Sequence, residues 1–170
     1  MNYGQIILMD TANGKGFRLS LFVSGCRHHC KNCFQPETWN FKFGKQFTDE
    51  TLRYILKELS KPQYDGITIL GGEPFEPENQ LVINHIVSVI RSELPNKTIW
   101  IYTGCVYETE LLNSNSPYRT KYTDKILYNT DILVDGPFIE EQKDIRLEFR
   151  GSKNQRILNL NEIRKGATYE

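Results

Sequence analysis

The sequence contains no long hydrophobic run, since no apolar stretch approaches the about 20 residues that a membrane-spanning helix needs. The N-terminus, MNYGQIILMDTANGKG, lacks the basic region, sustained apolar stretch and small-residue cleavage site of a signal peptide. Charge of one sign is not in excess either, because 21 Lys and Arg residues balance 21 Asp and Glu residues. We therefore expect a soluble, cytoplasmic protein without a basic surface for nucleic acid or an anionic membrane.

Cysteine is also scarce, with four residues in a chain of 170, and three of these four lie within the segment SGCRHHCKNC. A small secreted domain held together by disulfides needs more cysteines, and needs them spread along the chain. In a reducing compartment, clustered thiols are more often metal ligands than disulfide partners. The cysteine pattern therefore directs attention to a metal site.

Hydrophobic patterns predict strands that alternate with helices along the chain. Strands are expected at residues 17–23, 66–70, 98–102, 131–135 and 156–160. Helices are expected at about 49–60, with Thr48 as N-cap, at 78–94 and at 118–128. This alternation is typical of a parallel sheet with crossover helices. We expect one α/β domain over residues 1–170, a compact partial (β/α) barrel with mostly parallel strands, because a closed barrel needs about 250 residues.

Short motifs follow several of these predicted strands. The cysteine segment follows the first strand, Gly71-Gly72-Glu73-Pro74 follows the second, and Thr103 and Asp135 stand at the ends of two others. In open α/β folds and barrels, ligands bind at the carboxyl ends of the strands. We therefore expect these motifs, far apart in sequence, to meet at one edge of the sheet.

The cysteine segment has the pattern Cys26-x3-Cys30-x2-Cys33. Iron–sulfur clusters are usually held by four cysteines, so three would leave one iron of a 4Fe–4S cluster open to a substrate or cofactor. A zinc site is the alternative, with His28 or His29 as the fourth ligand. Both histidines lie between the first two cysteines, where tetrahedral reach is awkward, so the spacing favours iron–sulfur and leaves zinc open.

The segment Gly71-Gly72-Glu73-Pro74 is a weaker signal on its own. Glycine and proline mark many ordinary turns between a strand and a helix. Alternatively, the bare glycine backbone would allow a ligand to approach closely, and Glu73 would supply a carboxylate for an amino group. The motif gains weight only in combination with the cysteines.

Taken together, these motifs resemble the radical S-adenosylmethionine (SAM) superfamily, and within it the anaerobic ribonucleoside-triphosphate reductase-activating proteins. The matching segments are MNYGQI, NGKGFRLSLFVSGCRHHCKNCFQPETWN, GGEPFEPEN, IWIYTG, DILVDGPF and FRGSKNQRI, which cover the chain nearly end to end. The resemblance implies an oxidoreductase with a partial (β/α) barrel. It implies that a reduced 4Fe–4S cluster cleaves SAM to a 5′-deoxyadenosyl radical, which removes hydrogen from a glycine of the reductase.

The resemblance also implies roles for individual residues, with no catalytic residue beyond the cluster ligands. Those ligands would be Cys26, Cys30 and Cys33. SAM would lie against Asn32, Cys33 and Phe34 on its adenine side and against Gly71, Gly72 and Glu73 on its amino side. Asn32 stands where glycine is commoner in the family, so its side chain must point away or take part in binding. We expect Cys105 to be buried and not a ligand, and His28 to lie in contact with the surroundings of the cluster.

The partners implied are the glycyl-radical subunit of the anaerobic reductase and a reducing electron donor such as flavodoxin or ferredoxin. No nucleic acid or membrane partner is expected, and a homodimer is left open. Two alternatives within the superfamily are an activase of another glycyl-radical enzyme and a radical SAM enzyme of a small metabolite. A non-enzymatic alternative is a zinc-binding or electron-transfer module, which would have no need of the GGEP motif.

Overall fold

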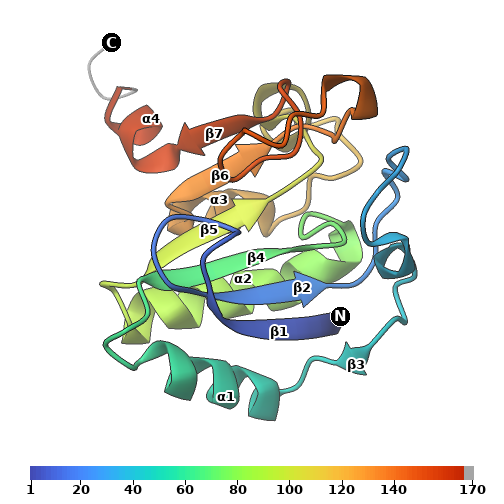
Figure 1. Ribbon diagram of the computed structural model, residues 1–170. Helices are drawn as coiled ribbons and strands as arrows, with labels where there is room; N and C mark the ends of the chain where they lie inside the picture. Colours follow the sequence, from blue (N-terminus) through green and yellow to red (C-terminus); the bar gives the residue numbers. More distant parts are fainter. Residues whose placement is uncertain (167–170) are drawn as a thin grey trace.

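The computed structural model describes residues 1–166, whose strands form one seven-stranded sheet in the order β3-β1-β2-β4-β5-β6-β7 (Figure 1). The strands are β1 (Asn2–Asp10), β2 (Arg18–Val23), β3 (Lys45–Gln46), β4 (Gly66–Gly71), β5 (Thr98–Tyr102), β6 (Ile132–Asp135) and β7 (Arg156–Asn159). The five strands predicted from the sequence are all present. Strand β1 was not predicted, because most of its side chains are exposed or half-buried and show no regular alternation.

The sheet is parallel only at its centre, where β2, β4, β5 and β6 are neighbours. On one side β1 pairs antiparallel with β2 and β3, and on the other β7 pairs antiparallel with β6. The expected α/β class is confirmed, but the sheet is mixed. The reason is that β1–β2 and β6–β7 are joined by loops without a crossover helix, which a parallel connection requires.

Four α-helices and three shorter turns complete the described residues. The helices are α1 (Asp49–Leu59), α2 (Pro77–Glu93), α3 (Thr123–Asn129) and α4 (Leu160–Gly166). The turns are the 3₁₀ segments Pro36–Trp39 and Glu140–Gln142 and the π-type turn Tyr107–Leu111. None of the helices in residues 1–166 combines the length and apolar character needed to cross a membrane.

Helix α1 begins after Thr48, whose side chain accepts a hydrogen bond from the Thr51 amide, as the predicted N-cap should. The prediction for α3 was too long, because residues 118–122 form turns. There the Tyr118 amide donates to the Ser116 hydroxyl and the Tyr122 amide donates to the Thr120 hydroxyl. Such local bonds from side chains to the backbone compete with helix formation.

The two faces of the sheet differ, because side chains alternate along each strand. The face toward α1, α2 and α3 carries the hydrophobic core, and α2 and α3 lie behind the sheet in Figure 1. Its strand residues are Leu19, Leu21, Val23, Ile67, Ile69, Ile99, Ile101 and Leu133. The opposite face carries buried polar groups such as Arg18, whose Nε donates to Thr68 Oγ1 at 2.6 Å. Loops cover this second face, and they leave room there for a cavity.

Candidate functional site

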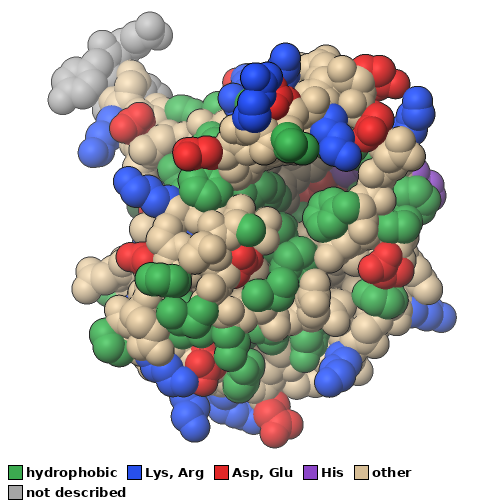
Figure 2. All heavy atoms as spheres, in the orientation of Figure 1, with side chains coloured by type: hydrophobic (Ala, Val, Ile, Leu, Met, Phe, Trp, Pro, Cys, Tyr) green, Lys and Arg blue, Asp and Glu red, His purple; other side chains and the backbone are tan. Residues whose placement is uncertain are grey.

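A cavity of about 460 Å³ lies at the carboxyl ends of the parallel strands. Its walls come from the loop after β2 (residues 24–35, the cysteine loop), from the turn after β4 (residues 71–74, the GGEP turn) and from Thr103, Gly104 and Gly136. Residues 137–155, the covering segment, close another side. Figure 2 shows the molecule hollowed here, with acidic and histidine side chains visible in the recess. The expected meeting of the motifs at one edge of the sheet is confirmed.

All the residues that the sequence assigned to a cluster or to SAM line this one cavity. They are Cys26, Cys30, Asn32, Cys33, Phe34, Gly71, Gly72 and Glu73. Phe34 lies at the rim, with 78% of its surface exposed, whereas Glu73 is fully buried. The structure thus brings the two predicted halves of the site together, although they are separated by almost forty residues of sequence.

The three clustered cysteines have free thiols and are each half-buried. Burial raises the pKa of the Cys26 thiol to about 12, and the negative charge of Glu73 adds to this shift. Burial also raises the pKa of Cys30, against a hydrogen bond from the Phe138 backbone amide that lowers it. These two thiols are therefore protonated in the metal-free chain at neutral pH, and binding a metal there must release protons.

The cysteine loop adopts unusual backbone conformations at two non-glycine residues. His29 has a φ of 47° and Asn32 a φ of 56°, in the left-handed region that most side chains avoid. Asparagine tolerates this region better than other non-glycine residues. Glycine would adopt this conformation without strain, and Asn32 is also part of the cavity wall.

The GGEP turn lies against the start of the cysteine loop. The Gly72 amide donates to the Val23 carbonyl at 2.7 Å, and the Glu73 amide donates to the Gly25 carbonyl at 2.8 Å. A Cβ atom on Gly72 would lie 2.6 Å from the Gly25 carbonyl oxygen. Glycine is therefore required here for the two loops to approach each other, a reason distinct from the ligand approach that the sequence indicated.

The Glu73 carboxylate accepts four hydrogen bonds, all of 2.8 Å. Oε1 accepts from the Phe75 amide and from Thr103 Oγ1. Oε2 accepts from the Gly104 amide and from Nε2 of His28. Thr103, which the sequence placed at a strand end, thus serves to hold Glu73. A carboxylate offers about four lone-pair sites, so this one is fully used.

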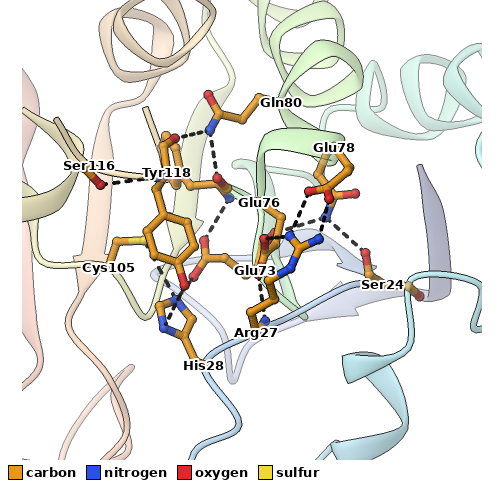
Figure 3. A network of polar contacts seen from close by, with 12 residues as sticks. Ser24, Arg27, His28, Glu73, Glu76, Glu78, Gln80, Cys105, Ser116 and Tyr118 are labelled. Carbon is orange, nitrogen blue, oxygen red and sulfur yellow. Dashed lines mark hydrogen bonds and ion pairs between the residues drawn. The ribbon is translucent and has the colours of Figure 1, made fainter. Parts of the chain in front are cut away.

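His28 lies beside Glu73 in this network, at its lower end in Figure 3. Its ring stacks on Tyr118, with ring centroids 5.1 Å apart, and its Nε2 lies 3.8 Å from the sulfur of Cys105. Burial alone would lower the pKa of His28, but the hydrogen bond to Glu73 and the charge of Glu73 outweigh this effect and raise it. Cys105 is fully buried, as expected, and burial raises the pKa of its thiol.

The positions of the two histidines bear on the zinc alternative. Nε2 of His28 is engaged with Glu73, and the His29 ring stacks on Trp39 with centroids 4.4 Å apart. His28 does share a group of metal-ligating atoms with Glu73 and Cys105, all within 4.8 Å of one another. That group excludes the three clustered thiols, and its carboxylate lone pairs are already occupied by hydrogen bonds.

Sequence reasoning missed a second buried carboxylate beside the site. Glu76 is fully buried, and its Oε1 accepts from the Arg27 amide at 2.7 Å while its Oε2 accepts from the Arg27 guanidinium (Figure 3). The signal was present in the GGEPFE segment, where Glu76 follows Glu73 by three residues, but nothing in the sequence indicated a partner in the cysteine loop. Asp135 is buried too, and its carboxylate pairs with Arg156 on β7.

Comparison with known proteins gives the site a context. Residues 12–158 match a family model described as a 4Fe-4S single cluster domain. This match includes the cysteine loop, the GGEP turn and the whole covering segment, which are the three main walls of the cavity.

Three relatives are each named anaerobic ribonucleoside-triphosphate reductase-activating protein. Those of Vibrio cholerae and Escherichia coli K12 are both 38% identical to this chain, covering 92% and 94% of it and 97% and 99% of their own lengths. That of bacteriophage T4 is 36% identical, over 92% of this chain and 93% of its own. The chain belongs to this family. As a member of the activating-protein family it is an activating enzyme with a 4Fe–4S domain.

Proposed function

We propose that this member of the activating-protein family binds a 4Fe–4S cluster through Cys26, Cys30 and Cys33 and uses SAM to install a radical on a glycine of anaerobic ribonucleoside-triphosphate reductase. The observation that carries the proposal is the single cavity that joins the three free thiols to the GGEP turn. Four parallel strands, each ending at this cavity, support assigning the sheet to the partial (β/α) barrel of the radical SAM superfamily.

The donor set fits such a cluster. Thiolates are the preferred ligands of iron–sulfur clusters, and three of them leave one iron free for another donor. Nε2 of His28 is held by Glu73 and the His29 ring stacks on Trp39, and we assign the cluster to the three cysteines alone. A cluster together with SAM would supply one electron and, by cleavage of the sulfonium, the 5′-deoxyadenosyl radical that takes hydrogen from the glycine.

The cavity also suits a ligand of the size of SAM. Small-molecule sites commonly measure about 300–1,000 Å³, and this cavity of about 460 Å³ is within that range. In the proposed pose, the backbone of Gly71 and Gly72 faces the amino group of SAM, and Asn32, Cys33 and Phe34 lie on the adenine side. Because the Glu73 carboxylate already accepts four hydrogen bonds, we assign it to holding the amino subsite in place.

The proposed partner follows from the names of the relatives, all of which activate the anaerobic reductase. The half-buried thiols lie at the molecular surface beside the exposed Phe34, where a protein loop and an electron donor can both approach. We propose flavodoxin or ferredoxin as the class of donor.

The test begins with anaerobic reconstitution with iron and sulfide, followed by reduction with dithionite and addition of SAM. The expected results are about four irons per chain, an EPR spectrum that changes with SAM, and release of 5′-deoxyadenosine. Addition of the anaerobic reductase should then give the EPR doublet of a glycyl radical. Stoichiometric zinc without colour would refute the cluster, and 5′-deoxyadenosine without a glycyl doublet would refute the partner.

A further inference from the structure

The two residues that follow Cys26 are held by two buried carboxylates of another loop. His28 contacts Glu73, and Arg27 contacts Glu76, through both its backbone amide and its guanidinium. Glu73 and Glu76 come from the GGEP turn and the residues just after it, and both are fully buried. The stretch between the first two cysteines is therefore attached to the neighbouring wall of the cavity, which the GGEP turn forms.

The contact between His28 and Glu73 is asymmetric. Three of the four donors to Glu73 are groups of the β4 and β5 ends, namely the Phe75 amide, the Thr103 hydroxyl and the Gly104 amide. These bonds fix the carboxylate whether or not His28 is present. His28 is the one donor from the cysteine loop. Glu73 therefore fixes the position of His28, and through His28 the position of the cysteine loop.

The rest of the His28 environment restricts its ring to one place. Tyr118 stacks on the ring at an interplanar angle of 19°. Gly104 lies so close that a Cβ there would be 2.6 Å from His28 Cδ2. Only 13% of the His28 side-chain surface is exposed. A ring held by a carboxylate, an aromatic face and a backbone segment gives the cysteine loop a fixed reference point.

We propose that His28 is a positioning residue, which sets the cysteine loop at the right separation from the Gly71–Gly72 backbone for both to contact one ligand. This inference rests on the proposed function, since that ligand is SAM held between the open iron and the GGEP turn. The hydrogen bond from His28 to Glu73 joins the metal half of the site to the amino half. Without it, the three thiols keep their cluster but lose their fixed placement relative to the SAM subsite.

The test compares His28→Phe, which keeps the stack on Tyr118 but has no donor, with His28→Gln, which retains an NH donor in place of Nε2. The reconstituted proteins are titrated with SAM, and the change in the EPR spectrum of the reduced cluster gives the SAM dissociation constant. We expect both variants to hold about four irons. We expect the SAM dissociation constant to be about tenfold higher in His28→Phe, because one charge-assisted hydrogen bond is lost. In His28→Gln it should stay within about threefold of the wild-type value.

A second readout uses the metal-free protein, so that it does not depend on the cluster. Amide hydrogen exchange in residues 26–33 should be faster in His28→Phe than in the wild type and restored in His28→Gln. If His28→Phe does not fold, His28→Ala takes its place in both measurements. The matched control is His85→Gln, on the exposed side of α2, which should bind SAM as the wild type does.

Each outcome has one meaning. Equal SAM affinity in His28→Phe and the wild type, or equal weakening in His28→Phe and His28→Gln, would overturn the positioning role. Loss of iron in His28→Phe would overturn it as well, because the residue would then act on the cluster itself. A wild-type protein that binds neither cluster nor SAM refutes the proposed function instead, and the exchange measurement still decides whether His28 holds the loop.

Discussion

Nε2 of His28 and Oε2 of Glu73 lie 2.8 Å apart, although 45 residues separate them in the sequence. The contact joins the cysteine loop, which follows β2, to the turn that follows β4. Parallel pairing of these strands brings Val23 opposite Gly71, so the two loops leave the sheet side by side. The sheet thus brings the two loops together, and the side chains then fix their separation.

Gly104→Ala tests the same arrangement from the other side. Its Cβ would lie 2.6 Å from the His28 ring, so the ring must shift from the position in which Nε2 contacts Glu73. We expect the variant to keep about four irons but to bind SAM about tenfold more weakly, as His28→Phe does. The measurement is the same EPR titration with SAM. Gly166→Ala is the control, since a Cβ there meets nothing within 4 Å; an unchanged SAM affinity in Gly104→Ala would count against the importance of the ring position.

The ligand set is tested by single alanine variants of the cysteines. Cys33→Ala should lose the cluster and the formation of 5′-deoxyadenosine, since two thiols do not hold a 4Fe–4S cluster on one loop. Cys105→Ala should keep most of both, because this buried thiol lies outside the three clustered cysteines. Iron and sulfide analysis together with EPR measures the outcome. Equal losses in the two variants would show that the ligand set is wrongly assigned.

From the sequence we could predict which strand each motif follows and that the motifs meet. The meeting place follows because the carboxyl ends of parallel strands share one edge of a sheet. The sequence did not allow the Arg27–Glu76 pair to be predicted, since charged residues near glycine-rich turns are usually solvent-exposed. Nor did it predict that Gly72 serves loop-to-loop approach, because glycine looks the same in sequence whichever neighbour requires it. The start of α3 was misplaced because hydroxyl side chains of Ser116 and Thr120 bind the backbone there.

Asn32 should be replaceable by glycine but not by alanine. Its φ of 56° costs an ordinary L-residue about 1–2 kcal/mol, whereas glycine adopts it freely. We expect Asn32→Gly to reconstitute about four irons at the wild-type rate and Asn32→Ala to reconstitute more slowly and less completely. Lys31→Ala, at a neighbouring residue without a positive φ, is the control. If Asn32→Gly reconstituted its cluster but failed to bind SAM, the Asn32 side chain would itself contact the ligand.

Loss of the buried partner of Arg27 should lower the free energy of unfolding more than loss of its exposed partner. Arg27 pairs with Glu76, whose side chain is 1% exposed, and with Glu78, whose side chain is 50% exposed. Glu76→Gln should lower the free energy of unfolding of the metal-free protein by about 1–3 kcal/mol, and Glu78→Gln by less than about 1 kcal/mol. Urea unfolding measures both. In a double-mutant cycle, Arg27→Ala with Glu76→Gln should show a coupling of about 1 kcal/mol or more; equal effects of the two glutamine variants would contradict this account.

Asp131 links three elements at the far end of the sheet from the cavity. We expect its titration to make the free energy of unfolding depend on pH. Its Oδ2 accepts from Arg91 on α2 and from the Ile99 amide on β5, both at 2.8 Å, and its Oδ1 accepts from Asn161 on α4. Burial alone would raise the pKa of Asp131, but the hydrogen bond from Arg91 and the other two donors lower it below its ordinary value of 3.8. The ionised carboxylate is therefore the form that stabilises the fold.

Because the pKa of Asp131 is lower in the folded than in the unfolded chain, its stabilising contribution is complete above the unfolded pKa and is lost as pH falls through the folded one. We expect Asp131→Asn to lower the free energy of unfolding by about 1–3 kcal/mol at pH 7, since Arg91 loses its charged partner. The difference from the wild type should stay constant down to about pH 5 and shrink below about pH 4. Urea unfolding across this range measures it, with Asp124→Asn, which removes an exposed pair with Arg119, as a control expected to cost less than about 1 kcal/mol. A difference that already shrinks between pH 7 and pH 5 would show that another group carries the effect.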